Sequence, residues 1–304
     1  MGWVAAWAAG GGSDMGSVDM GRTNTIFRSA ERLIFAVGML LMAAGSAVAG
    51  WEAGTKLGFD SNVGRSIQSG KSDAYLLAYG GFSREPSGES RGDWVFSASA
   101  EGAAFASVTD LDYAAITLSP GLVYFPHAGW TITVAPILQA KTVRDSDQSA
   151  VAFGGKIELR ERLGEKAYLA EHYAYKDSRA TSDIFSYKEH AVGALLGMNW
   201  TPALSSEIGY EFSRGDSFLS VGTSTATSGG MVGFGGRVMP GMFSSAFGSD
   251  VVKERVDRHA LGATIGYEWT RSIFSVAGYT VTVLRGDVGS SISNAGFAGV
   301  GYRF

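Results

Sequence analysis

The four histidines of this chain are the side chains that could act as a general base. They are His127, His172, His190 and His259. His190 and His259 have a serine nearby in the sequence, Ser186 and Ser249 respectively, and a serine beside a histidine is the usual nucleophile–base pair of a hydrolase. Such a pair also needs an orienting group within reach, and the spacing shows no such set. A lipid hydrolase is therefore the least favoured interpretation, and we expect the protein not to be an enzyme.

A second group of residues could select solutes by charge. Ionisable side chains stand at alternate positions of segments that are otherwise apolar: Glu52, Lys56, Glu101, Lys141, Lys156, Glu158, Arg160, Glu207, Glu211 and Glu268. They could line a solute path and set its selectivity. They could also pair with one another, because buried charges need partners. The alternating signs of Lys156, Glu158 and Arg160 favour pairing, and the mixed signs argue against a path for acidic oligosaccharides.

These charges belong to a pattern of period two, which is typical of β-strands. In the segment 259–269, Leu261, Ile265 and Tyr267 share one face, while Thr264 and Glu268 share the other. The pattern predicts twelve strands at 51–60, 73–83, 93–106, 112–125, 130–143, 150–162, 166–176, 187–200, 204–214, 258–269, 272–285 and 292–304. Short and long connections between them mostly alternate, as they do in membrane barrels of even strand number. The long stretch from Gly215 to Asp257 is predicted to be a loop that could fold into the mouth as a constriction, present an adhesive extracellular surface or contact lipopolysaccharide.

Aromatic residues favour a membrane barrel over a soluble one, because they cluster at the predicted strand ends: Trp51, Trp94, Tyr124, Trp130, Trp200, Trp269, Tyr302 and Phe304. We expect them to form girdles at the two membrane interfaces. In a membrane barrel the apolar face points outward and the charged face points inward. The sequence therefore predicts an all-β fold, a transmembrane antiparallel up-and-down barrel of about twelve strands.

The N-terminal region resembles an export signal. Arg22, Arg28 and Arg32 precede a short apolar run that ends in Ala47-Val48-Ala49, a small-x-small cleavage pattern. We expect residues 1–49 to be leader and signal peptide, with the true start at Met20, and residues 50–304 to form one barrel. The formal charge of −4 predicts no nucleic-acid partner. Cysteine is absent, and no His, Asp or Glu cluster has metal-ligand spacing, so we expect no metal and no cofactor.

The last strand carries a family resemblance. Gly299, Tyr302 and the terminal Phe304 resemble the C-terminal insertion signal of Gram-negative outer-membrane proteins. The resemblance implies recognition by the barrel-assembly machinery and a location in the cell outer membrane, among its lipid and lipopolysaccharide. Phe297 departs from the family pattern, in which that position is usually polar.

Two functions remain open at this point. The first is a porin or narrow passive channel for small hydrophilic solutes. The second is a non-conducting structural or surface-interaction barrel, or a sleeve for a periplasmic partner. The segment 57–63, LGFDSNV, also resembles the opening strand of some bacterial barrels that are fused to repeat domains or paired with periplasmic cytochromes, but seven residues do not assign a subfamily.

Overall fold

The computed structural model describes residues 49–304 except 88–89, 223–225, 228–230, 235–236 and 245. The predicted signal peptide and the start at Met20 lie outside these residues, apart from Ala49, so both stay predictions. The strands are β1 (Ala49–Asp60), β2 (Asp73–Arg84), β3 (Gly92–Phe105), β4 (Tyr113–Tyr124), β5 (Trp130–Val143), β6 (Ala150–Arg162), β7 (Ala167–Ala180), β8 (Tyr187–Asn199), β9 (Leu204–Gly222), β10 (Ala226–Thr227), β11 (Met231–Phe234), β12 (Arg237–Ser244), β13 (Ser249–Glu268), β14 (Ile273–Arg285) and β15 (Ser290–Arg303).

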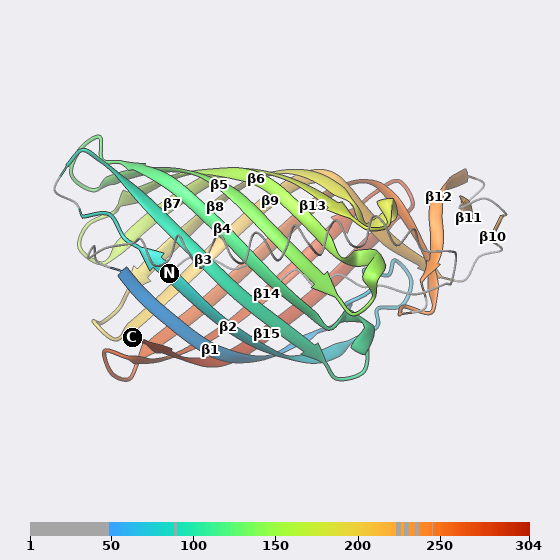
Figure 1. The fold of residues 1–304 in the computed structure, drawn as a ribbon, viewed down its shortest axis with the longest axis horizontal. Helices are drawn as coiled ribbons and strands as arrows, with labels where there is room; N and C mark the ends of the chain where they lie inside the picture. Colours follow the sequence, from blue (N-terminus) through green and yellow to red (C-terminus); the bar gives the residue numbers. More distant parts are fainter. Residues whose placement is uncertain (1–48, 88–89, 223–225, 228–230, 235–236, 245) are drawn as a thin grey trace, which may run out of the picture.

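Twelve of these strands form one closed antiparallel barrel. Strands β1 to β9 pair in chain order, β9 pairs with β13, and β15 returns to pair with β1. Figure 1 shows the barrel lying along its axis, with the C-terminus at one end and β10, β11 and β12 beyond the other. We call these the turn end and the loop end. Closure of β15 against β1 leaves the last strand with no free edge.

The prediction was wrong about much of the 215–257 stretch. Strand β9 continues to Gly222, β13 already begins at Ser249, and the two pair with each other beyond the ends of the neighbouring strands. Local sequence gives only a weak signal here, because each extension is stabilised mainly by the other. Strand β7 likewise runs four residues past its predicted end, to Ala180.

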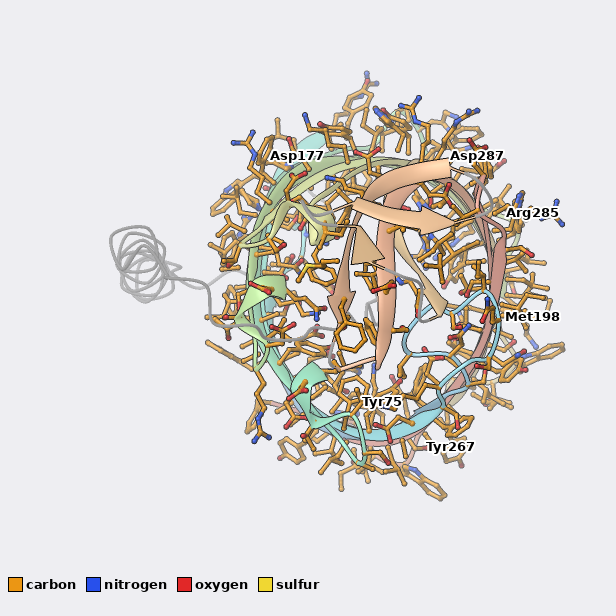
Figure 2. The ribbon with its side chains drawn as sticks, turned by 90° about the vertical axis from the view of Figure 1, so that its right-hand side faces the viewer. Tyr75, Asp177, Met198, Tyr267, Arg285 and Asp287 are labelled. Atoms are coloured by element: carbon orange, nitrogen blue, oxygen red, sulfur yellow. The ribbon has the colours of Figure 1, made fainter. Side chains whose placement is uncertain are left out.

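The outer face of the barrel is apolar. Large side chains that are about half exposed follow one parity of the strands, among them Leu57, Ile157, Ile208, Leu261 and Val300. Such a surface suits hydrocarbon and not water. In the view along the axis, Tyr267 lies outside the ring of strands and Tyr75 lies inside it (Figure 2).

The expectation of two aromatic girdles was wrong for the residues on which it rested. All eight aromatics lie at the turn end, where β1, β3, β5 and their partners begin or end, so they form a single girdle. The opposite rim carries ring pairs of another kind. Tyr173 is hydrogen-bonded to His190 and Tyr210 to His259, each at 2.7 Å.

The glutamate at 171 stands within the apolar exterior. Glu171 of β7 is exposed on the outer parity, between Leu169 and Tyr173 of its own strand. Its cross-strand neighbours are Leu159 and Ala194, so its surroundings are apolar on every side. Among the described residues, no helix is long and apolar enough to cross a bilayer.

Candidate functional site

The inner wall carries the predicted charges. All of them, from Glu52 on β1 to Glu268 on β13, stand on the parity opposite the exposed apolar side chains. The register brings them onto one continuous surface, with Lys56 opposite Gly299 and Glu101 opposite Ala115. Their inward position follows from the alternation alone. Their role in conduction stays a prediction.

Aromatic rings on the inner wall lie flat against it. Tyr79 stands directly opposite Gly54, and Phe297 stands directly opposite Gly278. A Cβ added to Gly54 would meet the Tyr79 hydroxyl at 2.7 Å, so the ring occupies the place of the missing side chain. The same pairing recurs for Tyr75 with Gly58, Tyr168 with Gly197 and Phe274 with Gly301. Each ring therefore covers a glycine and does not extend into the bore.

Basic side chains lie over these rings, so that glycine, aromatic ring and cation form three successive layers on the inner wall. The Lys56 ammonium is 5.0 Å from the ring centre of Tyr79 and 4.9 Å from that of Phe297. The Arg160 guanidinium is 3.7 Å from the ring centre of Tyr168. Such contacts hold a cation in place without neutralising its charge. Phe297 departs from the insertion-signal pattern, but its ring packs on the inner wall between Gly278 and the Lys56 ammonium.

Several predicted charges also form ion pairs along the wall. Lys156 and Glu158 are 2.5 Å apart, so these two residues of the alternating run pair as expected, whereas Arg160 lies over the Tyr168 ring. Glu268 of β13 is 3.2 Å from Arg303 of β15, across the intervening strand β14. Glu207 accepts a hydrogen bond from the Tyr168 hydroxyl. The wall is therefore mixed in sign, and part of its charge is paired.

Histidine takes part in one of these clusters. His172 lies 3.1 Å from Glu211, which also pairs with Arg258, and Arg258 lies 3.3 Å from Glu189. The other histidines contact aromatic side chains: His127 stacks near Trp130, and the rim histidines bind tyrosines. None of these contacts is the serine–histidine pair that a hydrolase requires.

The loop end is narrowed from within by the first loop, residues 61–72. The Asn62 carboxamide donates to the Ser291 hydroxyl at 2.9 Å and to the Ile292 carbonyl at 3.1 Å, which ties the loop to β15. Ser66 bridges to Ser220, on the strand extension of β9. The loop thus crosses the interior from one wall to the other.

A second segment meets the first loop in the mouth. Ala246 is buried in the same cluster as Val63, which packs against Leu111 and other residues of the β2–β5 wall. The Lys71 ammonium donates to the Ala246 carbonyl at 3.0 Å. Phe247 stacks on Phe218 with ring centres 5.9 Å apart. We call Val63, Arg65, Ala246 and Phe247 the plug. The connection between β12 and β13, within the 215–257 stretch, therefore does fold into the mouth, which was one of the predicted alternatives.

Beneath the plug lies a cavity of about 110 Å³. Its charged lining comprises Arg65, Glu101, Lys141, Lys176, Glu189, Asp216 and Arg258. Arg65 reaches it from the first loop with a φ of 51°, an uncommon conformation for a non-glycine residue. Its guanidinium donates to the Ser217 hydroxyl at 2.7 Å and lies 4.7 Å from the ring centre of Phe218. Burial lowers the pKa of Arg65, but an arginine keeps its charge at any physiological pH.

Three basic residues of this inner wall were not among the predicted ones. Arg258 shares the inward parity of Glu268 on β13, Lys176 stands opposite the inward Gly154, and Arg303 stands opposite Glu52, so the alternation could have found them. No such signal exists in the sequence for Arg65, because residues of a loop do not alternate between an inner and an outer face.

At the seam, the three residues of the predicted insertion signal take different positions. Tyr302 and Phe304 are exposed on the outside, with ring centres 4.8 Å apart. Gly299 faces inward, where a Cβ would lie 2.5 Å from the Thr55 carbonyl oxygen. Closure against β1 therefore requires glycine at 299.

A solved structure shares this arrangement of strands. It is the crystal structure of the COG4313 outer membrane channel from Pseudomonas putida F1, which is 11% identical, superposes with a TM-score of 0.56, and is covered over 86% of this chain and 97% of that one. The fold is that of a Gram-negative outer-membrane β-barrel. The chain is also similar to the NanC porin (TM-score 0.48, 11% identity, 82% of this chain and 98% of that one) and to the KdgM porin (TM-score 0.46, 11% identity, 83% and 99%). No family model matches the chain. No curated protein sequence matches it either.

Proposed function

We propose that this protein is an outer-membrane channel that passes small hydrophilic solutes passively through its interior. The inner wall carries the proposal, because its rings lie on glycines and its cations lie on the rings, which keeps bulky groups out of the bore. A barrel sealed by its own side chains would send those groups across the interior instead. The shared fold with a protein described as an outer membrane channel supports the same function.

In this proposal the ten sequence-predicted charges set selectivity. Their mixed signs suit weak preferences between small solutes and not a strong preference for one sign. The plug would then act as the gate, since it occupies the loop end while the wall below it is polar.

The plug also supports the alternative of a barrel that does not conduct. Three clusters of buried apolar side chains lie at the loop end. The first contains Leu111, the second Leu219 and the third Phe185. A permanently filled mouth would leave a structural or surface-interaction barrel, or a sleeve for a periplasmic partner.

Liposome swelling separates these two functions. The barrel is refolded into liposomes that are then diluted into isotonic sugars of increasing size. A channel gives swelling rates that fall with solute size, because the bore excludes the larger sugars. Swelling no faster than in protein-free liposomes, with the barrel folded by heat-modifiable migration, would favour the non-conducting barrel.

Assembly is the second part of the proposal. The exposed pair Tyr302 and Phe304 ends the closing strand and would be available to the barrel-assembly machinery before closure. After insertion, the apolar exterior would be covered by outer-membrane lipid, with lipopolysaccharide in the outer leaflet.

A further inference from the structure

Basic side chains gather on one side of the barrel's outer rim. At the loop end, the outward-facing residue nearest the rim is Arg179 on β7, Lys188 on β8 and Arg285 on β14. Arg214 faces outward on β9, which pairs with β8. All four side chains are exposed, and Figure 2 shows Arg285 outside the ring of strands. We call these four residues the basic arc.

The other side of the rim is neutral at the same level. On β1 to β6, the outward-facing residues nearest the loop end are Phe59, Ala74, Ala104, Ala114, Thr142 and Val151. The basic arc is therefore confined to one side of the barrel. A ligand that recognises it would bind at that side and not all around the rim.

Below the basic arc, toward the turn end, the outer face becomes mostly apolar. His190, Arg214 and Arg285 belong to one row across the sheet. The next row contains Val192, Phe212, His259 and Val283, and the row after it contains Ala194, Tyr210 and Leu261. A lipid whose acyl chains cover these two rows would place its headgroup beside the basic arc. Cations at that level attract an anionic headgroup.

Two cations of the basic arc share a single buried carboxylate. Asp177 lies 3.6 Å from the Arg179 guanidinium and 3.6 Å from the Lys188 ammonium. The Asp177 side chain is 5% exposed, whereas those of Arg179 and Lys188 are 71% and 63% exposed. Asp183, in the connection between these two strands, is paired with Lys253 at 3.3 Å. One positive charge is therefore in excess at Arg179 and Lys188, and it lies at the surface.

The rest of the basic arc is closer to neutral. The Arg214 guanidinium is 3.5 Å from Asp257, which is also the cross-strand neighbour of Arg285. Asp287 lies in the turn that follows Arg285. These two cations and two carboxylates balance, so they can assist an anion but do not hold one alone. The centre of a site is therefore at Arg179 and Lys188.

Phosphate is an anion that suits this pair of cations. A guanidinium donates two parallel hydrogen bonds to a phosphate, and an ammonium adds a compact point charge. Both side chains can lie with their stems along apolar surface while their charged ends reach the headgroup level. The Arg179 guanidinium lies 5.3 Å from the ring centre of Phe153 on the neighbouring strand, which holds it against the outer wall.

We propose that the basic arc binds the phosphorylated headgroup of lipopolysaccharide. Arg179 and Lys188 would hold one phosphate, and Arg214 would lie near the second. The outer leaflet supplies such a ligand, and the loop end points toward it when the short turns face the periplasm. The inference concerns the exterior of the barrel and goes beyond the proposed channel function.

Lipid A, the membrane anchor of lipopolysaccharide, tests the site on the refolded barrel in detergent micelles. Microscale thermophoresis gives the affinities for lipid A with two phosphates, lipid A with one phosphate, and phosphatidylglycerol. A chelator in the buffer removes divalent metal ions, which could otherwise bridge a phosphate to Asp257. We expect lipid A with two phosphates to bind at least fivefold more tightly than either of the others. Equal affinities for the two forms of lipid A, or phosphatidylglycerol bound as tightly, would overturn the proposal.

Variants assign the contacts. Lys188→Gln should lower the affinity for lipid A at least fivefold. Arg144→Gln is the matched control and should leave it unchanged, because Arg144 follows β5 on the neutral side of the rim, is 62% exposed and pairs with Asp112. Equal losses in the two variants would refute the site. If a variant fails to fold, the comparison of the three lipids on the unaltered protein still decides.

The outcome is separable from the channel function. A barrel that swells liposomes but does not prefer lipid A with two phosphates would overturn this inference and leave the channel. A barrel that binds lipid A with the expected preferences but passes no solute would keep the site and remove the channel.

Discussion

Tyr168 of β7 lies over Gly197, its directly opposite partner on β8, and the Arg160 guanidinium lies over the other face of the same ring. A side chain at 197 would overlap the ring itself. This glycine therefore determines where a tyrosine and an arginine of the inner wall can lie.

Gly197→Ala should push the Tyr168 ring toward the bore. We expect a lower single-channel conductance and a loss of about 1–3 kcal/mol in the free energy of unfolding, because the wall is overpacked. The double variant Gly197→Ala with Tyr168→Ala should recover conductance. Gly80→Ala is the matched control, since a Cβ there meets no atom closer than 3.8 Å. Identical conductance in Gly197→Ala and Gly80→Ala would show that the ring does not limit the bore.

Glu211→Lys should shift ion selectivity toward anions. The substitution places a cation beside Arg258 and His172, which now share the Glu211 carboxylate. The reversal potential in a potassium chloride gradient measures the shift. Glu165→Lys makes the same charge change in a short connection at the turn end and should have a smaller effect. A reversal potential that does not move in Glu211→Lys removes this residue from the conducting path.

Phe304→Ala should lower the assembled yield in cells several-fold without harming a detergent-refolded sample. The ring is 76% exposed and contacts Tyr302, so the folded barrel depends little on it. Phe243→Ala, which removes an exposed ring outside the barrel wall, is the control. Heat-modifiable migration of membrane fractions gives the yield. Equal yields of the two variants would count against an insertion signal at the C-terminus.

Glu171→Leu should stabilise the barrel in lipid by roughly 1 kcal/mol, because a charge on the lipid-facing surface is unfavourable. The shift in urea midpoint in liposomes measures it. Glu165→Leu, outside the apolar surface, should give little change. A destabilised Glu171→Leu would mean that the carboxylate has a binding role on the exterior.

The alternation of side chains predicted the strands and the inner wall. Successive residues of a strand point to opposite faces, so the sequence of one strand is enough to tell which residues share a face. Leu261 and Glu268 could be placed on opposite faces from their spacing alone. The plug could not be predicted in this way. Val63 packs in the same cluster as Leu111, and Ser66 pairs with Ser220. These contacts join segments that are far apart in the sequence, and they produce no periodic pattern in it. The ring–glycine pairs also escaped prediction, because Tyr168 and Gly197 become partners only once the register is known.

Single-channel recording of the refolded protein in a planar bilayer shows whether the barrel conducts. We expect discrete, ohmic conductance steps, which become larger or more frequent in Phe247→Ser because the plug is weakened. Electrical silence of both proteins, with the barrel intact by heat-modifiable migration, would contradict it.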